Sequence, residues 1–461
     1  MKGLVLGVVP IKRGGTNMQV AVEQKELFLK KVKELCPDCV RLVDMEGTLE
    51  NGILWSYDQL ASAEAKLRQE GVNALFLPHC DFGCEEVVGR LGSMMGLPVL
   101  LWGNRDPLPV PGARDRDTQC GTLASTKCLQ RYGVPFSYII NSDVESAKFA
   151  KGFVDFCAVA NVVKAARRMR ILQVGSRPQP FLSVIYNEDE LLRRFGIEVT
   201  PWSSTSLVAD VQKVLAERGA EVDEGVQAYA TKVNCEKMSI EAQRTQQAIR
   251  IAIQDKVKAT DSDGVAVECW SMMPRALGVG ACQVIGMLSD LGIPAACETD
   301  VLGAITAVLL KAATLDRESL FFADITVRQA DEDNTELLWH CGPFPCSLQH
   351  PGSKPWIAPG GQGNFELKNG PITIARFDML EGKYYLFSGE GQAVDGPAKG
   401  GTYVWLKVDN WEDWEEKIVF GPYIHHVAGA YGNYSQILTE ACKYIQGLIP
   451  DPMRPVKKVL G

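Results

Sequence analysis

The sequence predicts an α/β protein in which parallel-sheet domains precede an antiparallel sheet or barrel. Between Gly3 and Trp102, strand-like and helical segments alternate with short loops, which is typical of parallel βαβ units with helices on both faces of a sheet. The alternation resumes at Met169. After about Thr314 the segments become short, rich in β-branched and aromatic residues, and separated by Gly, Pro and Asn turns, which indicates antiparallel pairing.

The elements can be assigned in order from hydrophobic periodicity. The first α/β unit is expected to contain strands 3–9, 40–43, 74–77 and 98–102 and helices 20–35, 62–69 and 85–95. The second unit is expected to contain strands 169–174, 197–200 and 265–270 and helices 189–195, 206–217, 240–259 and 280–291. The remainder is expected to contain strands 327–338, 365–378, 384–388 and 402–408 and a final helix, 436–446.

Composition limits the class of protein. A chain of 461 residues exceeds what one hydrophobic core usually supports, so two or three domains are expected. The formal charge of -8, without a clustered basic surface, argues against nucleic acid as a partner. No apolar run reaches the roughly 18 residues of a membrane span. Fourteen scattered cysteines with no signal-like start favour reduced thiols in the cytoplasm.

Two stretches place ionisable side chains in apolar surroundings. Glu298, Asp324 and His340 lie within Ala296–His340, and His425 and His426 follow about 85 residues later. Partly desolvated groups of this kind cost free energy unless they are paired, protonated or metal-bound. We therefore expect the stretches to meet, and a mixed carboxylate and imidazole set suits Mn²⁺, with Mg²⁺ or Co²⁺ as alternatives. Taken singly, Asp324 could be a strand-end carboxylate and His340 a satisfied core histidine.

Further candidates lie in loops at the carboxyl ends of predicted strands, where α/β proteins usually bind ligands. His79 and Arg105 follow strands of the first unit, and Arg177 and Trp270 follow strands of the second. An arginine could bind an anionic group bidentately, and Trp270 could stack on a sugar face. The loop at Gly175 lacks the spacing of a nucleotide-binding loop, so no nucleotide cofactor is expected.

Four motifs in order resemble the L-fucose isomerase and L-arabinose isomerase superfamily. They are ACETDVLGAIT (296–306), FFADIT (321–326) with Asp324 26 residues after Glu298, the histidine of LLWH (337–340), and HHVA (425–428). The resemblance implies two Rossmann-like, doubly wound parallel-sheet domains and a carboxyl-terminal antiparallel β-barrel. The expected bounds are 1–165, 166–315 with Glu298, and 316–461 with Asp324, His340 and His426.

The resemblance also implies a metal-dependent aldose-ketose isomerase that acts on an open-chain sugar through an enediol. Glu298, Asp324 and His426 would be the metal ligands, with His340 as a further ligand, and Glu298 and Asp324 would also move the proton. His425, Trp270, Arg105, His79 and Arg177 are candidates for sugar binding. The family implies a trimer or hexamer whose sites combine the metal shell of one subunit with an amino-terminal domain of another.

Other functions remain open at this stage. The sugar could carry phosphate or sulfonate, bound by loop arginines such as Arg105, Arg177 and Arg275. The chain could instead be a non-catalytic sugar-binding protein, although a pure binder needs no divalent site. A metal-dependent hydrolase would need an activated water, and the motifs resemble no hydrolase set. The sequence does not identify the aldose, its stereochemistry or the native ion.

Overall fold

The computed structural model describes residues 3–108 and 116–461. The chain divides into two compact units. The first contains Met1–Lys164 with the short segments Glu440–Ile445 and Val456–Gly461, and the second contains Ala165–Thr439 and Gln446–Pro455. The finer division into domains 1–165, 166–315 and 316–461 stays a prediction.

The first unit is built on a five-stranded parallel sheet in the order β2-β1-β3-β4-β5. Its strands are β1 (Leu4–Val8), β2 (Val40–Val43), β3 (Ala74–His79), β4 (Val99–Gly103) and β5 (Phe136–Tyr138). Its helices are α1 (Met18–Leu35), α2 (Leu60–Gln69), α3 (Glu85–Met95), α4 (Thr118–Arg131) and α5 (Ala147–Ala166). This is the order of flavodoxin-like folds, a doubly wound arrangement that differs from the order of the dinucleotide-binding fold. The Rossmann-like detail of the prediction is therefore not confirmed.

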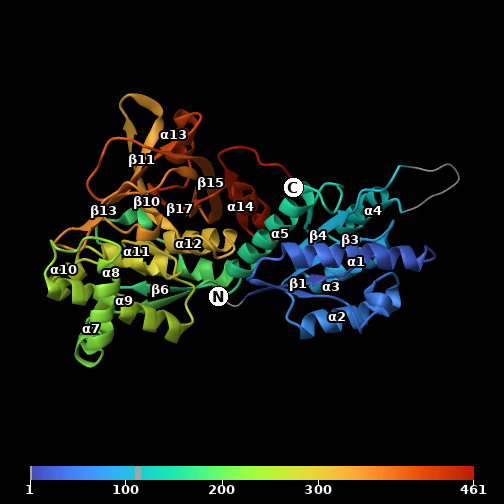
Figure 1. The fold of residues 1–461 in the computed structure, drawn as a ribbon, viewed down its shortest axis with the longest axis horizontal. Coiled ribbons are helices and arrows are strands. Elements are labelled where there is room, and N and C mark those ends of the chain that lie inside the picture. The colour runs from blue at the N-terminus through green and yellow to red at the C-terminus, as the bar shows by residue number, and fades with distance from the viewer. Residues whose placement is uncertain (1–2, 109–115) are drawn as a thin grey trace. The chain divides into compact units, whose positions relative to one another are not determined.

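Each face of this sheet has its own core, as Figure 1 shows by the helices on either side of the strands. On one face, Phe28 of α1 and Phe149 of α5 pack on Trp102 of β4, at centroid distances of 5.1 and 4.2 Å. On the other face, aliphatic side chains of α2, α3 and α4 cover β3 and β4. A sheet covered on both faces explains why its strands read as continuous apolar runs in the sequence.

The second unit contains a four-stranded parallel sheet in the order β7-β6-β8-β9. Its strands are β6 (Arg170–Val174), β7 (Glu198–Trp202), β8 (Gly264–Val267) and β9 (Ala295–Cys297). The helices are α6 (Glu188–Glu190), α7 (Ser204–Glu217), α8 (Gly219–Ala230), α9 (Ile240–Thr260), α10 (Met272–Leu277), α11 (Cys282–Asp290) and α12 (Val301–Ala313). Because all four strands are parallel, the loops that follow β6, β8 and β9 lie at one edge of the sheet.

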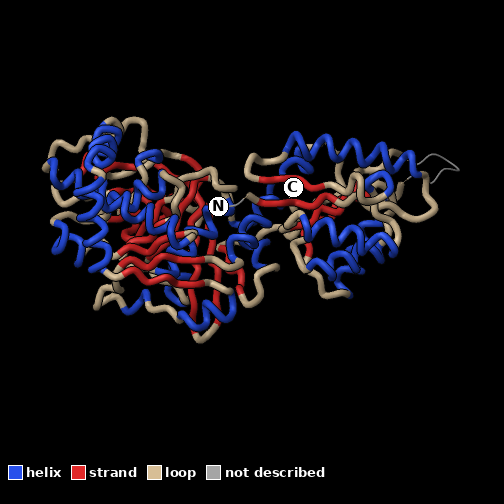
Figure 2. Tube along the Cα trace, turned by 90° about the horizontal axis from the view of Figure 1, so that it is seen from below, coloured by secondary structure: helices blue, strands red, loops and turns tan. Residues whose placement is uncertain are grey.

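The second unit also contains a closed antiparallel barrel. Its ring is β10-β11-β16-β15-β14-β17, with β17 pairing back to β10. The ring strands are β10 (Phe321–Gln329), β11 (Glu332–His340), β14 (Gly370–Leu380), β15 (Lys383–Val394), β16 (Thr402–Lys407) and β17 (His426–Tyr431). The short strands β12 (Trp356–Ile357), β13 (Gly363–Glu366) and β18 (Leu448–Pro452) extend the sheet, and α13 (Trp411–Phe420) and α14 (Ser435–Cys442) complete the elements. Figure 2 shows these strands in red. The expected carboxyl-terminal barrel is present.

Helix α12 connects the parallel sheet to the barrel. All of its residues are buried, and it packs on β8 and β9 on one side and on β14 and β17 on the other. A helix that is apolar on every side must be covered on every side. Its amino terminus therefore lies where the sheet edge and the barrel meet, which is the position of the Glu298 loop.

Several element bounds differ from the sequence expectation. The single strand expected at 327–338 is a hairpin, because the polar run around Ala330 and Asp331 turns the chain between β10 and β11. The strand expected at 365–378 is likewise two strands, β13 and β14, and the helix at 189–195 continues α6 as a π-helical turn. Among residues 3–108 and 116–461, no helix has both the length and the apolar character to cross a membrane.

Candidate active site

Four segments of the second unit bring the predicted ionisable residues together. Glu298 lies in the loop between β9 and α12, Asp324 lies on β10, His340 ends β11, and His426 begins β17. The register pairs Asp324 with His426 across β10 and β17. The barrel therefore fixes Asp324 and His426 as neighbours, and the Glu298 loop approaches them from the sheet.

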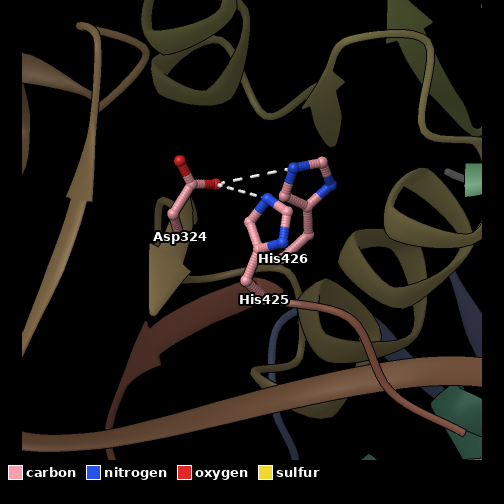
Figure 3. Close-up of side chains that lie close together, drawn as sticks. All are labelled: Asp324, His425 and His426. Atoms are coloured by element: carbon pink, nitrogen blue, oxygen red, sulfur yellow. Dashed lines mark ion pairs between the residues drawn. The ribbon is translucent and has the colours of Figure 1, made fainter. Parts of the chain in front are cut away.

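The distances define a compact polar cluster. Asp324 Oδ1 is 3.5 Å from His426 Nε2 and 4.0 Å from His425 Nε2, as the dashed lines in Figure 3 show. His426 Nε2 is also 3.2 Å from Glu298 Oε2, and His340 Nε2 is 3.9 Å from Asp324 Oδ1. Asp324, His425 and His426 each direct a potential ligand atom to a common point. The structure thus brings together all five of these candidates.

Three atoms of this cluster are buried without a hydrogen-bond partner in the described part of the chain. They are Asp324 Oδ1, His340 Nε2 and His426 Nε2. Buried polar atoms are nearly always satisfied, and each unsatisfied one costs about 1–3 kcal/mol. Three such atoms lie together here, which makes this cluster a candidate for holding a group that supplies their partners.

Asp300 fixes the tautomer of His426. Its Oδ2 accepts a hydrogen bond from His426 Nδ1 at 3.0 Å, and its carboxylate also pairs with the fully buried Arg376. Although burial opposes ionisation, the charge of Arg376 and the hydrogen bond from His426 hold the pKa of Asp300 below its usual range. An ionised Asp300 can only accept, so Nδ1 of His426 carries a proton and Nε2 faces Glu298 and Asp324. Although burial opposes it, the hydrogen bonds to Asp300 and Glu298 raise the pKa of His426 to about 9, so a cation that binds Nε2 would displace a proton.

His340 has the opposite arrangement. Its Nδ1 accepts a hydrogen bond from the backbone N–H of Cys341 at 2.9 Å. In neutral imidazole the other nitrogen then carries the proton, so His340 presents an Nε2–H donor to the cluster. The two buried histidines therefore offer different chemistry: His426 offers an Nε2 that can bind a cation in exchange for a proton, and His340 offers an Nε2–H donor.

The Glu298 loop has an unusual backbone. Glu298 and Thr299 have φ values of 60° and 57°, a left-handed conformation that costs non-glycine residues about 1–3 kcal/mol each. Hydrogen bonds hold the strained turn: Thr299 N donates to Val267 O at 3.1 Å, and Thr299 Oγ1 donates to Ser176 O at 3.2 Å. Asp300 then caps α12 by accepting from Gly303 N at 2.9 Å. The turn positions Glu298 beside the barrel.

Two further candidates lie in loops at the same sheet edge as Glu298. Arg177 follows β6, and its Nη1 donates to the carbonyls of Pro178, Gln179 and Phe181 at 3.0–3.2 Å. Trp270 follows β8, is 46% exposed and packs on the Phe181 ring at 5.7 Å. The edge thus presents a guanidinium and a half-exposed aromatic face.

The candidates of the first unit are differently placed. His79 is fully buried, with Nε2 2.9 Å from Ser125 Oγ and Nδ1 3.3 Å from Leu77 O, so both ring nitrogens have partners. Burial lowers the pKa of His79 to about 4, which keeps the ring neutral. Its contacts are those of a core histidine. Arg105 is exposed, and its carbonyl accepts a hydrogen bond from Arg116.

The sequence reasoning missed Arg376 and undervalued Asp300. Asp300 directly precedes an apolar helical segment in the sequence, a position that predicts a helix cap; it is a cap, but it also orients His426. Arg376 and Asp378 alternate with apolar residues in β14, and both side chains are buried and paired. A buried arginine in an apolar strand requires a carboxylate partner, and that rule was the available signal.

Comparisons with known proteins agree with this architecture. Residues 7–167 match the family model of the fucose/sulfoquinovose isomerase amino-terminal domain. A sulfoquinovose isomerase of Priestia aryabhattai is 24% identical, over 95% of this chain and 97% of its own. Sulfoquinovose isomerases of Alkalicoccus urumqiensis and Clostridium sp. (strain MSTE9) are each 25% identical, over 72% and 59% of this chain and 75% and 60% of theirs.

The matches indicate a class first: proteins similar to sugar isomerases, with the amino-terminal domain of that family. These matches support assignment to the fucose isomerase-like superfamily, and the family resemblance predicted from the four motifs is confirmed. A solved periplasmic solute-binding protein from Actinobacillus succinogenes 130z aligns with 68% of this chain and 91% of its own at 11% identity, with a TM-score of 0.17, which carries no argument about this fold.

Proposed function

We propose that the protein is an aldose-ketose isomerase whose substrate is an anionic sugar, in the first place a sulfonated hexose. The observation that carries the proposal is similarity over nearly the whole chain, 95%, to relatives named sulfoquinovose isomerase. The relatives favour the anionic-sugar hypothesis over a neutral aldose. The pairing of proton-transfer groups with unsatisfied ligand atoms supports an enzyme over a sugar-binding protein.

A divalent ion fits the residues of the cluster. Glu298, Asp324 and His426 would hold it, because Asp324 Oδ1 and His426 Nε2 are buried and unsatisfied and Glu298 Oε2 lies beside them. Neighbouring ligand atoms of an octahedral ion lie about 3 Å apart when each is about 2.1 Å from the ion. The separations of 3.2 and 3.5 Å from His426 Nε2 are close to that value. When bound, Mn²⁺ or Mg²⁺ would act as a Lewis acid on the adjacent sugar oxygens.

The residues of the chain would move the proton between the two carbons. Isomerisation removes the proton from C2 of the aldose and returns one to C1, while a proton is also exchanged between O1 and O2. Glu298 and Asp324 reach the cluster from different elements, the loop after β9 and strand β10, so either carboxylate could serve as base or acid. The His340 Nε2–H would donate a hydrogen bond to a substrate oxygen beside Asp324, which makes His340 a donor in this proposal instead of a fourth ligand.

Arg177 and Trp270 would bind the sugar at the sheet edge. Arg177 uses Nη1 for carbonyls of its own loop, which leaves Nε and Nη2 for the anionic group. The exposed face of Trp270 would stack on the sugar, and His425, half-exposed beside Asp324, would contact a hydroxyl. In the trimer or hexamer that we propose with the family, Arg105 of a neighbouring subunit could contribute, while His79 is enclosed by its own core.

The test is an assay for ketose formation from sulfonated, phosphorylated and neutral hexoses with Mn²⁺, run in deuterium oxide and repeated after chelation. We expect turnover of the sulfonated sugar, deuterium at the reacting carbon of the product, and loss of both on chelation. Glu298→Gln should abolish turnover, with Glu332→Gln at the exposed start of β11 as the matched control. Full turnover by Glu298→Gln would overturn the proposal. So would the absence of deuterium incorporation with every sugar tested.

A further inference from the structure

Four cysteines of the second unit converge beside the candidate active site. Cys269 follows β8, Cys282 begins α11, Cys297 ends β9 and Cys341 follows β11. Cys269 Sγ is 2.8 Å from Cys297 Sγ, and Cys282 Sγ is 3.2 Å from Cys341 Sγ. Cys282 also affects the pKa of Cys269, and Cys341 that of Cys297, so the two pairs adjoin and form what we call a ring of four sulfurs.

This arrangement differs from ordinary packing of cysteine as a small apolar residue. Four segments, up to 72 positions apart (341 − 269), direct their sulfur atoms to one point. A disulfide has an S–S distance of about 2.05 Å, so Cys269 and Cys297 need to approach by only about 0.8 Å to bond. Both are fully buried, whereas Cys341 is partly exposed and gives the ring its contact with solvent.

We propose that these four cysteines form a redox-active thiol site in which a peroxide oxidises Cys269 and Cys297 to a disulfide. The Cys269 thiolate attacks the O–O bond, which yields a sulfenic acid on Cys269 and one water. The Cys297 sulfur then displaces the hydroxyl, which forms the S–S bond and releases a second water. In total, two thiols are oxidised and one hydrogen peroxide is reduced to two waters.

The surroundings of Cys269 favour the first step. Hydrogen bonds from the thiols of Cys282 and Cys297, acting against burial, lower the pKa of Cys269 to about 7. The thiolate is the reactive form of cysteine, so Cys269 is the member of the ring best prepared to attack. Cys282 is a positioning residue, because it acts on the peroxide only through Cys269.

The position of the ring gives oxidation a consequence for the site. Cys297 directly precedes Glu298, whose left-handed backbone leaves little freedom to absorb a displacement. Drawing Cys297 toward Cys269 would displace Glu298 from its 3.2 Å position beside His426 Nε2. Oxidation should therefore lower turnover, an expectation that rests on the proposed function, whereas disulfide formation does not.

The full-length protein is treated with hydrogen peroxide, alkylated in denaturant and analysed by mass spectrometry. Trypsin releases Cys269 in a peptide without other cysteines (259–275), and cleavage at Asp290 separates Cys297 from Cys282. We expect a Cys269–Cys297 cross-link that dithiothreitol reverses. Cys297→Ser should replace the cross-link with a sulfenic acid on Cys269 that dimedone traps, and Cys282→Ser should slow the reaction several-fold at pH 7 and less at pH 9.

Cys157→Ser is the matched control, since Cys157 is equally buried but lies in α5, and it should react as the unaltered protein does. The proposal is overturned if all four thiols remain alkylatable after peroxide. It is also overturned if the purified chain holds zinc or iron through the four sulfurs, seen as metal release on thiol modification. A cross-link in a protein without isomerase activity would uphold this site and reject the proposed function.

Discussion

The first parallel sheet and the barrel of the second unit both hold buried histidines and carboxylates, but the two sets differ in how their polar atoms are satisfied. In the first unit, His79 has a partner at each ring nitrogen, and Asp81 accepts hydrogen bonds from Arg13 N and Gly83 N at 2.8 Å. In the second unit, Asp324, His340 and His426 each keep a buried atom unsatisfied. The same residue types thus have their hydrogen bonds satisfied in one unit and keep unsatisfied atoms in the other, where we propose that a ligand binds.

The largest effect is expected at His426. His426→Ala should lower turnover by about 10³-fold, because it removes both the Nε2 atom facing Glu298 and the partner of Asp300. Mn²⁺ binding, followed by calorimetry without substrate, should be lost as well. His350→Ala, in a loop that contacts Asp395, is the control and should keep both properties. Normal metal affinity in the His426 variant would show that the unsatisfied atoms of the second unit do not mark a metal site.

His79 should affect stability with little effect on turnover, and the effect should depend on pH. Its pKa is lowered to about 4 by burial, against about 6.5 in an unfolded chain. Between these pH values the unfolded state binds more protons than the folded state. The neutral His79 ring therefore contributes about 3 kcal/mol to the free energy of unfolding above pH 6.5, and this contribution is lost as the pH falls toward 4.

His79→Gln should remove that dependence, as followed by urea unfolding between pH 4 and 7. Its KM for the sugar should not change. A His79→Gln variant with an unaltered slope of stability against pH would show that the ring is not enclosed as described.

Asp300→Asn tests the orientation of His426. The amide can donate to or accept from Nδ1, so the tautomer is no longer fixed, and metal affinity should fall by about 10–100-fold. Removing the charge also leaves the buried Arg376 less compensated, which should cost about 3–5 kcal/mol of unfolding free energy. Asp378→Asn, which also contacts Arg376 but not His426, is the control: it should lose stability and keep its metal affinity.

The smallest effect is expected at Arg177. Arg177→Lys keeps the charge but loses the planar fork, so KM for a sulfonated sugar should rise by about tenfold, with kcat little changed. Kinetics with the corresponding neutral sugar provide the comparison, since its KM should not respond. An equal rise in KM for both sugars would show that Arg177 only stabilises its own loop and does not bind the anionic group.

Many helices and strands could be predicted from the sequence because local hydrophobic patterns determine them. Strand 40–43 and helix 85–95 have the observed bounds, since each is a short apolar run or an amphipathic segment ended by a turn. The hairpin at Ala330 was missed because the alternation of apolar residues continues on both sides of a polar turn. Closure of the barrel depends on pairing β10 with β17, about 100 residues apart, which no local pattern encodes.

The candidate site followed the same rule. Glu298, Asp324 and His426 were found because ionisable residues in apolar runs are conspicuous. The roles of Asp300 and Arg376 could not be predicted, because they depend on a contact between residues 76 positions apart that only the folded chain makes. The different tautomers of His340 and His426 depend on one backbone N–H and one carboxylate, which the sequence does not distinguish.

The all-round burial of α12 has a consequence for how the molecule unfolds. One side of the helix covers the parallel sheet and another covers the barrel, so the sheet and the barrel cannot separate without exposing apolar surface to water. The sheet and the barrel should therefore melt in a single transition, and a fragment that ends near Leu315 should aggregate, because α12 would present its bare barrel-facing side to water.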